Sequence, residues 1–225
     1  METKHFEATF DAILNRIEKA RLRLSQHHIV KIVAASKSAT PDMIEAMYRI
    51  GQRSFGENKI QDMSDKVEAL SHLPLEWHFI GRLQTNKINH LIDLHPSLMH
   101  SLSSLELAQE IDKRLSVKGK TMNALLQINS AYEDQKAGVL PEVALETYDQ
   151  IISLCPNIHL KGVMSIGAHV EDPTVIRKSF EKTRSIFDDL QSKGAKYCSM
   201  GMSSDFELAI ACGSNMIRLG SILFK

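Results

Sequence analysis

The chain has 225 residues, of which 43% are hydrophobic and 24% are charged, a composition typical of a folded globular protein. Its 27 Lys and Arg residues balance 27 Asp and Glu residues, and no basic block stands out, so nucleic acid is not an expected partner. The three cysteines are far apart, which predicts buried thiols in a reducing compartment and argues against disulfides or a zinc site; they are Cys155, Cys198 and Cys212. Because nucleic acid is not an expected partner, small molecules are the expected ligands.

The amino-terminal segment has the spacing of an amphipathic helix. Its apolar positions are Phe6, Phe10, Ile13, Leu14, Ile17 and Leu24. It is neither a secretory signal nor a membrane span, and Glu2, Glu7 and Asp11 argue against an acid-poor mitochondrial presequence. We therefore expect a cytoplasmic protein without a membrane segment.

Beyond this helix, short apolar runs alternate with helical patterns, as in repeated βα units. Helix start signals occur at Thr40-Pro41 and Asp172-Pro173. The predicted strands cover residues 29–37, 53–56, 77–81, 98–102, 123–129, 160–166, 197–201 and 216–220. The predicted helices that follow the first one cover residues 40–51, 57–70, 85–92, 104–115, 141–154, 172–194 and 205–212.

Strands separated by helices run parallel, and this number of them favours a closed barrel. An open doubly wound sheet is the rival, but the Gly-x-Gly-x-x-Gly turn that usually follows its first strand is missing, and residues 36–40 stand in its place. No linker divides the chain. We therefore predict an α/β protein in which residues 1–225 form a single (β/α)8 TIM-type barrel with an extra amino-terminal helix.

Two cationic residues fall on the strands that a closed barrel brings together, the first and the last. Lys37 closes the first apolar run, and the two-residue period of a strand places it on the face of Val33. Arg218 shares a face with Met216 on the last strand. An amine among apolar residues is costly unless it is neutralised, paired or consumed in a Schiff base.

Hydroxyl and glycine residues follow the last two strands, where barrels of this type often hold a phosphate group. Ser203 and Ser204 follow the seventh strand, and Gly220-Ser221 follows the eighth. Side-chain hydroxyls and free backbone N–H groups suit a phosphate at this position.

An amine that can form an imine, a phosphate cradle and an arginine within reach of a ring nitrogen together predict pyridoxal 5′-phosphate. A guanidinium only donates hydrogen bonds, so Arg218 would leave the pyridine nitrogen unprotonated. An unprotonated ring is a weak electron sink, which disfavours deep carbanion stabilisation.

Five motifs in this order resemble those of the pyridoxal phosphate homeostasis protein family. They are VAASK at 33–37, FGENKIQ at 55–61, WHFIGRLQTNK at 77–87, GMSSDFE at 201–207 and IRLGS at 217–221. The resemblance implies a barrel similar to the amino-terminal domain of alanine racemase, with the cofactor held as an internal aldimine on Lys37. It also implies a set of residues around the cofactor: Ser203, Ser204, Gly220 and Ser221 at the phosphate, Arg218 at the ring nitrogen, and Asn58 nearby.

The family is regarded as carrying and buffering the vitamin B6 cofactor, with no firmly established reaction, so the resemblance implies no catalytic residue. It implies pyridoxal phosphate-dependent apoenzymes as candidate partners, and a monomer is favoured over an obligate oligomer. Alanine racemases add a β-rich domain that supplies an opposing tyrosine, whereas this sequence ends five residues after Gly220. We therefore expect no robust turnover.

Two enzymatic alternatives remain open at this stage. A single-domain racemase or lyase would use the same imine and needs a second base, such as Tyr132 or a tyrosine from a partner subunit. A cofactor-free Schiff-base aldolase would use Lys37 directly.

The histidines give a weaker signal than the lysine and the arginine. A strand histidine such as His78 is more often structural than catalytic. His72, His90, His95 and His100 lack the spacing of metal ligands, so no metal site is expected.

Overall fold

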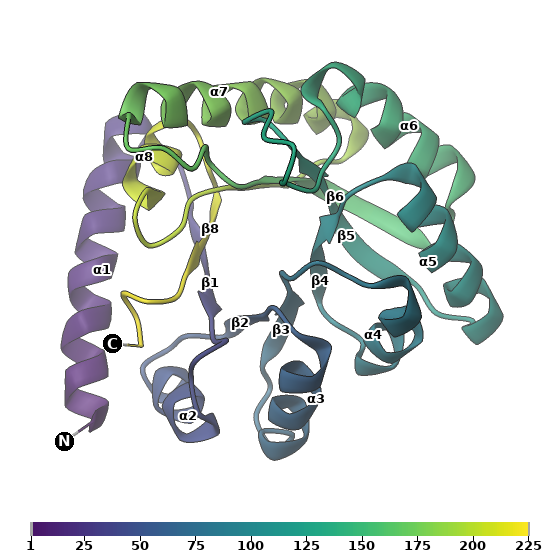
Figure 1. Cartoon of the computed structure of the whole chain (residues 1–225). Helices are drawn as coiled ribbons and strands as arrows, with labels where there is room; N and C mark the ends of the chain where they lie inside the picture. Colours follow the sequence, from purple (N-terminus) through teal and green to yellow (C-terminus); the bar gives the residue numbers. More distant parts are fainter. Residues whose placement is uncertain (1, 225) are drawn as a thin grey trace.

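The computed structural model describes residues 2–224, with side chains from residue 6 onward, and it forms a closed barrel of parallel strands surrounded by helices (Figure 1). The strands are β1 (Lys31–Ala35), β2 (Ser54–Glu57), β3 (Glu76–Phe79), β4 (Leu98–Leu102), β5 (Met122–Ile128), β6 (Ile158–Ser165), β7 (Tyr197–Ser199) and β8 (Met216–Leu219). The helices are α1 (Glu2–Leu24), α2 (Pro41–Arg49), α3 (Ile60–Ala69), α4 (Ile88–Leu94), α5 (Leu105–Lys118), α6 (Ala144–Leu154), α7 (Pro173–Leu190) and α8 (Phe206–Ala211). Short 3₁₀ turns occupy Thr85–Lys87, Pro141–Val143 and Gln191–Lys193.

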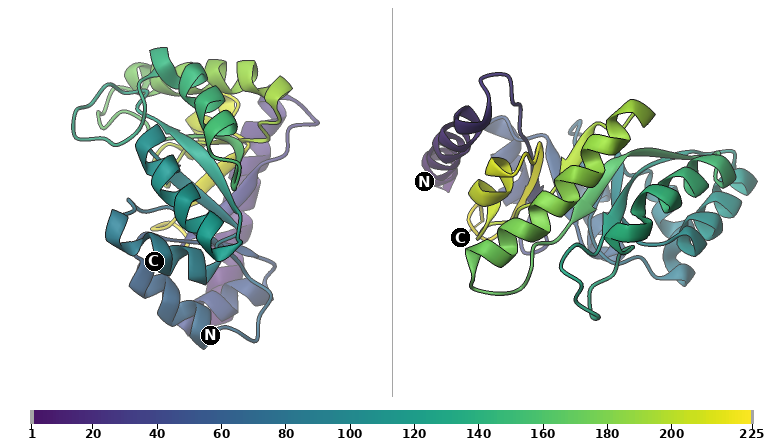
Figure 2. Two further views of the ribbon diagram at one scale, coloured as in Figure 1. Left: turned by 90° about the vertical axis from the view of Figure 1, so that its right-hand side faces the viewer. Right: turned by 90° about the horizontal axis from the view of Figure 1, so that it is seen from above.

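The barrel closes because β1 pairs in parallel with both β2 and β8. The predicted (β/α)8 barrel is confirmed, and so is the extra amino-terminal helix. That helix, α1, lies outside the ring against the segment that carries α8 and β8, as the view from above shows (Figure 2). Arg16 of α1 fixes this contact through two 2.9 Å hydrogen bonds to the Glu207 carboxylate on α8.

The start signals read from the sequence act as helix caps. The Thr40 hydroxyl accepts a hydrogen bond from the Met43 N–H at 3.3 Å, and the Asp172 carboxylate accepts one from the Thr174 N–H at 2.8 Å. Each side chain satisfies an N–H group that has no partner within the first turn of its helix. The predicted beginnings of α2 and α7 therefore have a local physical cause.

The first strand ends two residues earlier than its apolar pattern predicts, at Ala35 rather than Lys37. The Ala39 N–H bonds to the Ser36 carbonyl oxygen at 2.9 Å, and this turn takes the chain off the sheet before Lys37. The second strand instead extends to Glu57, whose carbonyl oxygen accepts a 2.9 Å hydrogen bond from the Ile80 N–H. The next helix consequently begins at Ile60, later than predicted.

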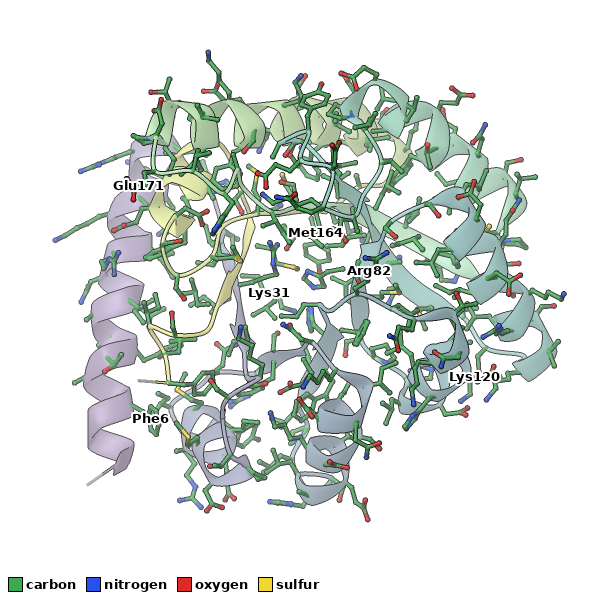
Figure 3. The ribbon with its side chains drawn as sticks, in the orientation of Figure 1. Phe6, Lys31, Arg82, Lys120, Met164 and Glu171 are labelled. Atoms are coloured by element: carbon green, nitrogen blue, oxygen red, sulfur yellow. The ribbon has the colours of Figure 1, made fainter. Side chains whose placement is uncertain are left out.

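The interior of the barrel holds an apolar cluster separate from the layer between strands and helices. Its buried members are Val33, Leu98, Leu125, Met164 and Met216. Figure 3 shows Met164 and Lys31 toward the middle of the ring of strands, with Phe6 and Lys120 outside it. The three cysteines are free and buried, as predicted. Within residues 2–224, no helix combines the length and the apolar character needed to cross a membrane.

Candidate cofactor site at the carboxyl ends of the strands

Lys37 lies in the turn that follows β1, at the carboxyl end of the barrel. Its side chain is exposed, so the expectation of a lysine enclosed by apolar residues is wrong, because the turn at Ser36 lifts the residue out of the strand. Among residues 2–224 no hydrogen-bond or ion-pair partner holds its amine. The amine is therefore available to an external ligand.

A buried ion pair anchors the residue next to Lys37. The Lys66 Nζ atom of α3 donates to Glu57 Oε1 and to the Ser36 carbonyl oxygen, both at 2.7 Å. The Ser36 hydroxyl donates to the same Glu57 oxygen at 2.6 Å. Glu57 is fully buried, and its other oxygen, Oε2, has no partner among the described residues. The cluster ties the start of the Lys37 turn to β2 and α3.

Arg218 lies on β8 directly beside Val33 of β1, and only 6% of the residue is exposed. Its Nη1 atom donates to the Ser199 carbonyl oxygen at 2.9 Å and to the Ser199 hydroxyl at 2.7 Å, while Nη2 donates to the Ser165 carbonyl oxygen at 2.8 Å. Burial lowers the pKa of Arg218 to about 10, and the charge of Asp205 opposes that shift. The guanidinium is therefore protonated at neutral pH.

These contacts leave part of the guanidinium unused. A guanidinium has five N–H groups, and the Nε–H and the second Nη2 hydrogen of Arg218 have no acceptor within the described chain. Arg218 is thus held in one orientation with donors to spare.

Two histidines continue the polar contacts of Arg218 across the barrel. The Ser199 hydroxyl lies 3.2 Å from His100 Nδ1, and His100 Nε2 lies 2.8 Å from His78 Nδ1. Burial lowers the pKa of His78 and holds that of His100 well below its usual value, and His78 and Arg218 near His100 further disfavour a charge on it. Both imidazoles are therefore neutral at pH 7, and the hydrogen bonds form a chain from Arg218 to His78.

The loops after β7 and β8 meet at the same end of the barrel. The Gly220 N–H donates to the Ser203 hydroxyl oxygen at 3.2 Å, which joins the two loops. Gly201 has a φ of +97°, and a side chain there would also press on Ala209. The Ser204 and Ser221 side chains are less enclosed, and their hydroxyls have no partner in the described structure.

The register of β8 with β1 brings Gly220 beside Ala35: a Cβ added at Gly220 would lie 3.2 Å from the Ala35 carbonyl oxygen. The Lys37 turn and the Ser203 and Ser221 loops therefore share one rim. Ser204 also lines a 390 Å³ cavity together with Asp205 and Lys136. Burial raises the pKa of the Asp205 carboxyl, while its hydrogen bond with the Met202 N–H opposes the rise.

Asn58 lies in the loop between β2 and α3, on the same end of the barrel but with an exposed side chain. Its backbone packs against Gly81, where an added Cβ would come within 1.8 Å of the Asn58 carbonyl oxygen. Glycine at position 81 is therefore required by this close approach. Asn58 lines a cavity of about 650 Å³ with Lys59, Arg82 and Lys87 among its other lining residues.

Tyr132, the candidate second base of a racemase, lies in the loop after β5 with 46% of the residue exposed. Its hydroxyl donates to the Glu142 carboxylate and accepts a 2.6 Å hydrogen bond from Lys182. These contacts hold the phenol on the outer surface of the loops, where it is already committed to two charged partners.

The sequence analysis did not predict the two buried polar clusters, the Glu57–Lys66 ion pair and the hydrogen-bonded His78–His100 pair. Strand alternation could have found His100, because it shares a face with the inward Leu98 two residues earlier. No sequence signal pairs Glu57 with Lys66, since a loop and a helical turn separate them and only the folded chain brings them within 2.7 Å.

The closed barrel of parallel strands has the fold of the barrels found in alanine racemases. In agreement, the family model for the alanine racemase N-terminal domain matches residues 9–225.

Comparison with individual relatives and solved structures identifies the family within this class of barrels. The chain is 57% identical over 220 residues to the pyridoxal phosphate homeostasis protein of Helicobacter pylori, with 98% of each chain covered. A crystal structure of an unknown protein from Bifidobacterium adolescentis superposes with a TM-score of 0.93 at 32% identity, covering 99% of this chain and 95% of that one. The pyridoxal phosphate-bound structure of PipY from Synechococcus elongatus gives a TM-score of 0.79 at 31% identity, covering 94% and 99%. This chain belongs to the pyridoxal phosphate homeostasis protein family.

Proposed function

We propose that this chain binds pyridoxal 5′-phosphate covalently through Lys37 and serves intracellular homeostasis of that cofactor, with residues 1–225 acting as one domain and without robust turnover. The observation that carries the proposal is Arg218, a buried guanidinium held with spare donors on the strand that pairs with β1. The PipY structure with the cofactor bound supports the choice of ligand.

The donor set fits the cofactor group by group. The bound cofactor supplies an aldehyde carbon, on which a primary amine condenses with release of one water molecule. Lys37 offers that amine without a competing partner in the described chain. Arg218 would donate toward the ring nitrogen, and the hydroxyls and backbone N–H groups of Ser203, Ser204 and Ser221 would hold the phosphate. Gly220 allows the last loop to approach β1 closely.

Two features favour a carrier over a racemase. Arg218 stays protonated and cannot give the ring nitrogen a hydrogen bond acceptor, so the ring is a weak electron sink. Tyr132 is bonded to Glu142 and Lys182, which disfavours it as a free opposing base. Asn58 is proposed near the cofactor through its loop beside Gly81.

The proposal includes a cellular setting. Three free buried cysteines suit the reducing cytoplasm. We expect a monomer that passes cofactor to pyridoxal phosphate-dependent apoenzymes. Size-exclusion chromatography with light scattering tests the first point, and reactivation of a cofactor-free transaminase by the loaded protein tests the second.

The decisive test is chemical trapping. The purified protein should absorb in the visible range as an imine, and borohydride followed by peptide mass spectrometry should locate the pyridoxyl mass on Lys37. Lys37→Ala should lose the absorption, whereas the rim variants Lys59→Ala and Lys87→Ala should keep it. A label on Lys59 or Lys87 would refute the assignment to Lys37. A colourless protein would refute cofactor binding and leave the cofactor-free aldolase for testing with sugar phosphates.

A further inference from the structure

A second cavity lies at the opposite end of the barrel from Lys37. It is an open cavity of about 260 Å³ at the amino ends of the strands, where Lys31 begins β1, Glu76 begins β3, Leu98 begins β4 and Met216 begins β8. Figure 3 shows Lys31 toward the middle of the ring. The cavity therefore opens into the bottom of the barrel interior.

His78 lines this cavity and has an unsatisfied nitrogen. Only 2% of the residue is exposed, and Nε2 has no hydrogen-bond partner among the residues described. The Glu76 carboxylate is 3.9 Å away, beyond hydrogen-bond length. A buried polar atom without a partner is costly, so it marks a place where a ligand or a water molecule belongs.

The direction of the hydrogen-bond chain makes this nitrogen a donor. The Ser199 hydroxyl accepts from Arg218, so its own proton needs an acceptor, and His100 Nδ1 at 3.2 Å is the one available in the described chain. The neutral His100 then carries its proton on Nε2 and donates it to His78 Nδ1 at 2.8 Å. The proton of neutral His78 is left on Nε2, on the side of Glu76, which also lines the cavity. This assignment gives the Ser199 hydroxyl proton and the His100 ring proton an acceptor each.

The other lining groups favour a negatively charged acceptor. Three lysines line the cavity, Lys31, Lys161 and Lys196, against one carboxylate, Glu76. Lys31 is bonded to Glu76 at 2.5 Å, and the nearby His78 ring together with the hydrogen bonds from Lys31 and Ser54 holds the pKa of that carboxyl well below its usual range. Within residues 2–224, neither of the other two lysine amines has an ion-pair partner. The lining therefore carries two positive charges without an ion-pair partner in the described chain, on half-buried Lys161 and exposed Lys196.

We propose that this cavity is a second ligand site, which binds a small oxyanion through the His78 Nε2–H group and the amines of Lys161 and Lys196. The volume suits a phosphate group or a short dicarboxylate rather than a whole cofactor. The site is distinct from the rim that carries Lys37, and the only step that rests on the proposed function is the use of cofactor-loaded protein in the test below.

The experiment is a titration of the borohydride-reduced, cofactor-loaded protein with inorganic phosphate, and separately with malonate, at constant ionic strength. Filling the cofactor site first keeps added phosphate away from the Ser203 loop. The readout is the imidazole resonances of His78 and His100 in long-range ¹H–¹⁵N spectra, which also report which nitrogen carries the proton. We expect a saturable shift at His78 Nε2 with at least one of the two anions.

Lys161→Ala combined with Lys196→Ala should weaken the binding by about tenfold or more, as expected for the loss of charge-assisted hydrogen bonds. Lys113→Ala, at an exposed position outside this cavity, should not change it. Circular dichroism verifies folding of each variant. No saturable shift with either anion, or an unchanged affinity in the double variant, would overturn the site. A failure of cofactor loading shows in the absorption spectrum beforehand and counts against the proposed function alone.

Discussion

Lys66→Ala should destabilise the protein strongly, because it removes the cation from a buried pair and leaves the anion in place. Lys66 Nζ contacts Glu57 Oε1 and the Ser36 carbonyl oxygen, both at 2.7 Å. Glu57 has no exposed surface, and its second carboxylate oxygen already lacks a partner in the described structure. The substitution therefore leaves a buried charge with the Ser36 hydroxyl as its one remaining hydrogen-bond donor there.

Breaking a buried ion pair in this way costs about 3–5 kcal/mol. For a chain of this size each kcal/mol lowers the Tm by about 2–4 °C, so the expected drop is roughly 6–20 °C. Urea denaturation and thermal unfolding followed by circular dichroism measure both quantities. The turn that presents Lys37 also loses its anchor, so pyridoxal phosphate affinity should fall in parallel.

Two variants test whether the charge is the cause. Lys66→Met combined with Glu57→Gln removes both charges and should regain at least half of the lost stability, since an isolated buried charge is no longer present. Arg49→Ala breaks an exposed ion pair with Glu45 and should cost about 0.5 kcal/mol or less. A loss below about 1 kcal/mol in Lys66→Ala, with an unchanged denaturant slope, would show that water reaches Glu57 and would refute the reasoning.

Three further outcomes are expected. Ser203→Ala with Ser204→Ala should lower cofactor affinity roughly ten- to a hundredfold without unfolding the barrel; unchanged retention on dialysis would contradict the phosphate cradle. Burial keeps His78 and His100 neutral in the folded protein, whereas both take up protons below about pH 6.5 in the unfolded chain. The unfolding free energy should therefore fall as the pH drops below that value, by up to about 1.4 kcal/mol per pH unit for each histidine. Urea denaturation from pH 7.5 to 5.5 should show this slope, and a flat profile would disprove it. Finally, α-proton exchange of L-alanine in deuterated water should be slow, and Lys37-dependent racemisation with kcat above about 1 s⁻¹ would support the enzymatic alternative.

The barrel could be predicted because its signals are local. Strand runs, caps such as Thr40 and helix-ending glycines repeat along the chain, and parallel pairing then follows from the crossovers. The boundary at Lys37 was missed because an apolar pattern continues through Ala35 while the turn is fixed by a hydrogen bond from Ala39 to Ser36. Burial pattern alone does not locate such a bond.

The polar interior could not be predicted because it depends on distances across the barrel. His78, His100 and Ser199 lie on β3, β4 and β7, and their contacts depend on how the barrel closes. The alternation of side chains along a strand indicates which of these three residues face inward, but it does not indicate which of them contact one another. The strand and face of Arg218 predict it as a site residue, yet its bonds to the Ser165 and Ser199 carbonyl oxygens depend on the register of β6, β7 and β8.

The way in which Arg218 is held connects folding to binding. Three hydrogen bonds to Ser199 and Ser165 fix the plane of the guanidinium, while Nε–H and one Nη2 hydrogen stay without an acceptor in the described chain. The Nε atom is not among the fully buried side-chain atoms that lack a partner, so this donor is accessible from the barrel end. The ordering of the side chain is thus complete before a ligand arrives, so a ring nitrogen that meets these donors need not order them. Burying the Arg218 cation lowers the free energy of unfolding of the barrel. The same buried, oriented guanidinium raises the affinity for a ligand at the rim that carries Lys37.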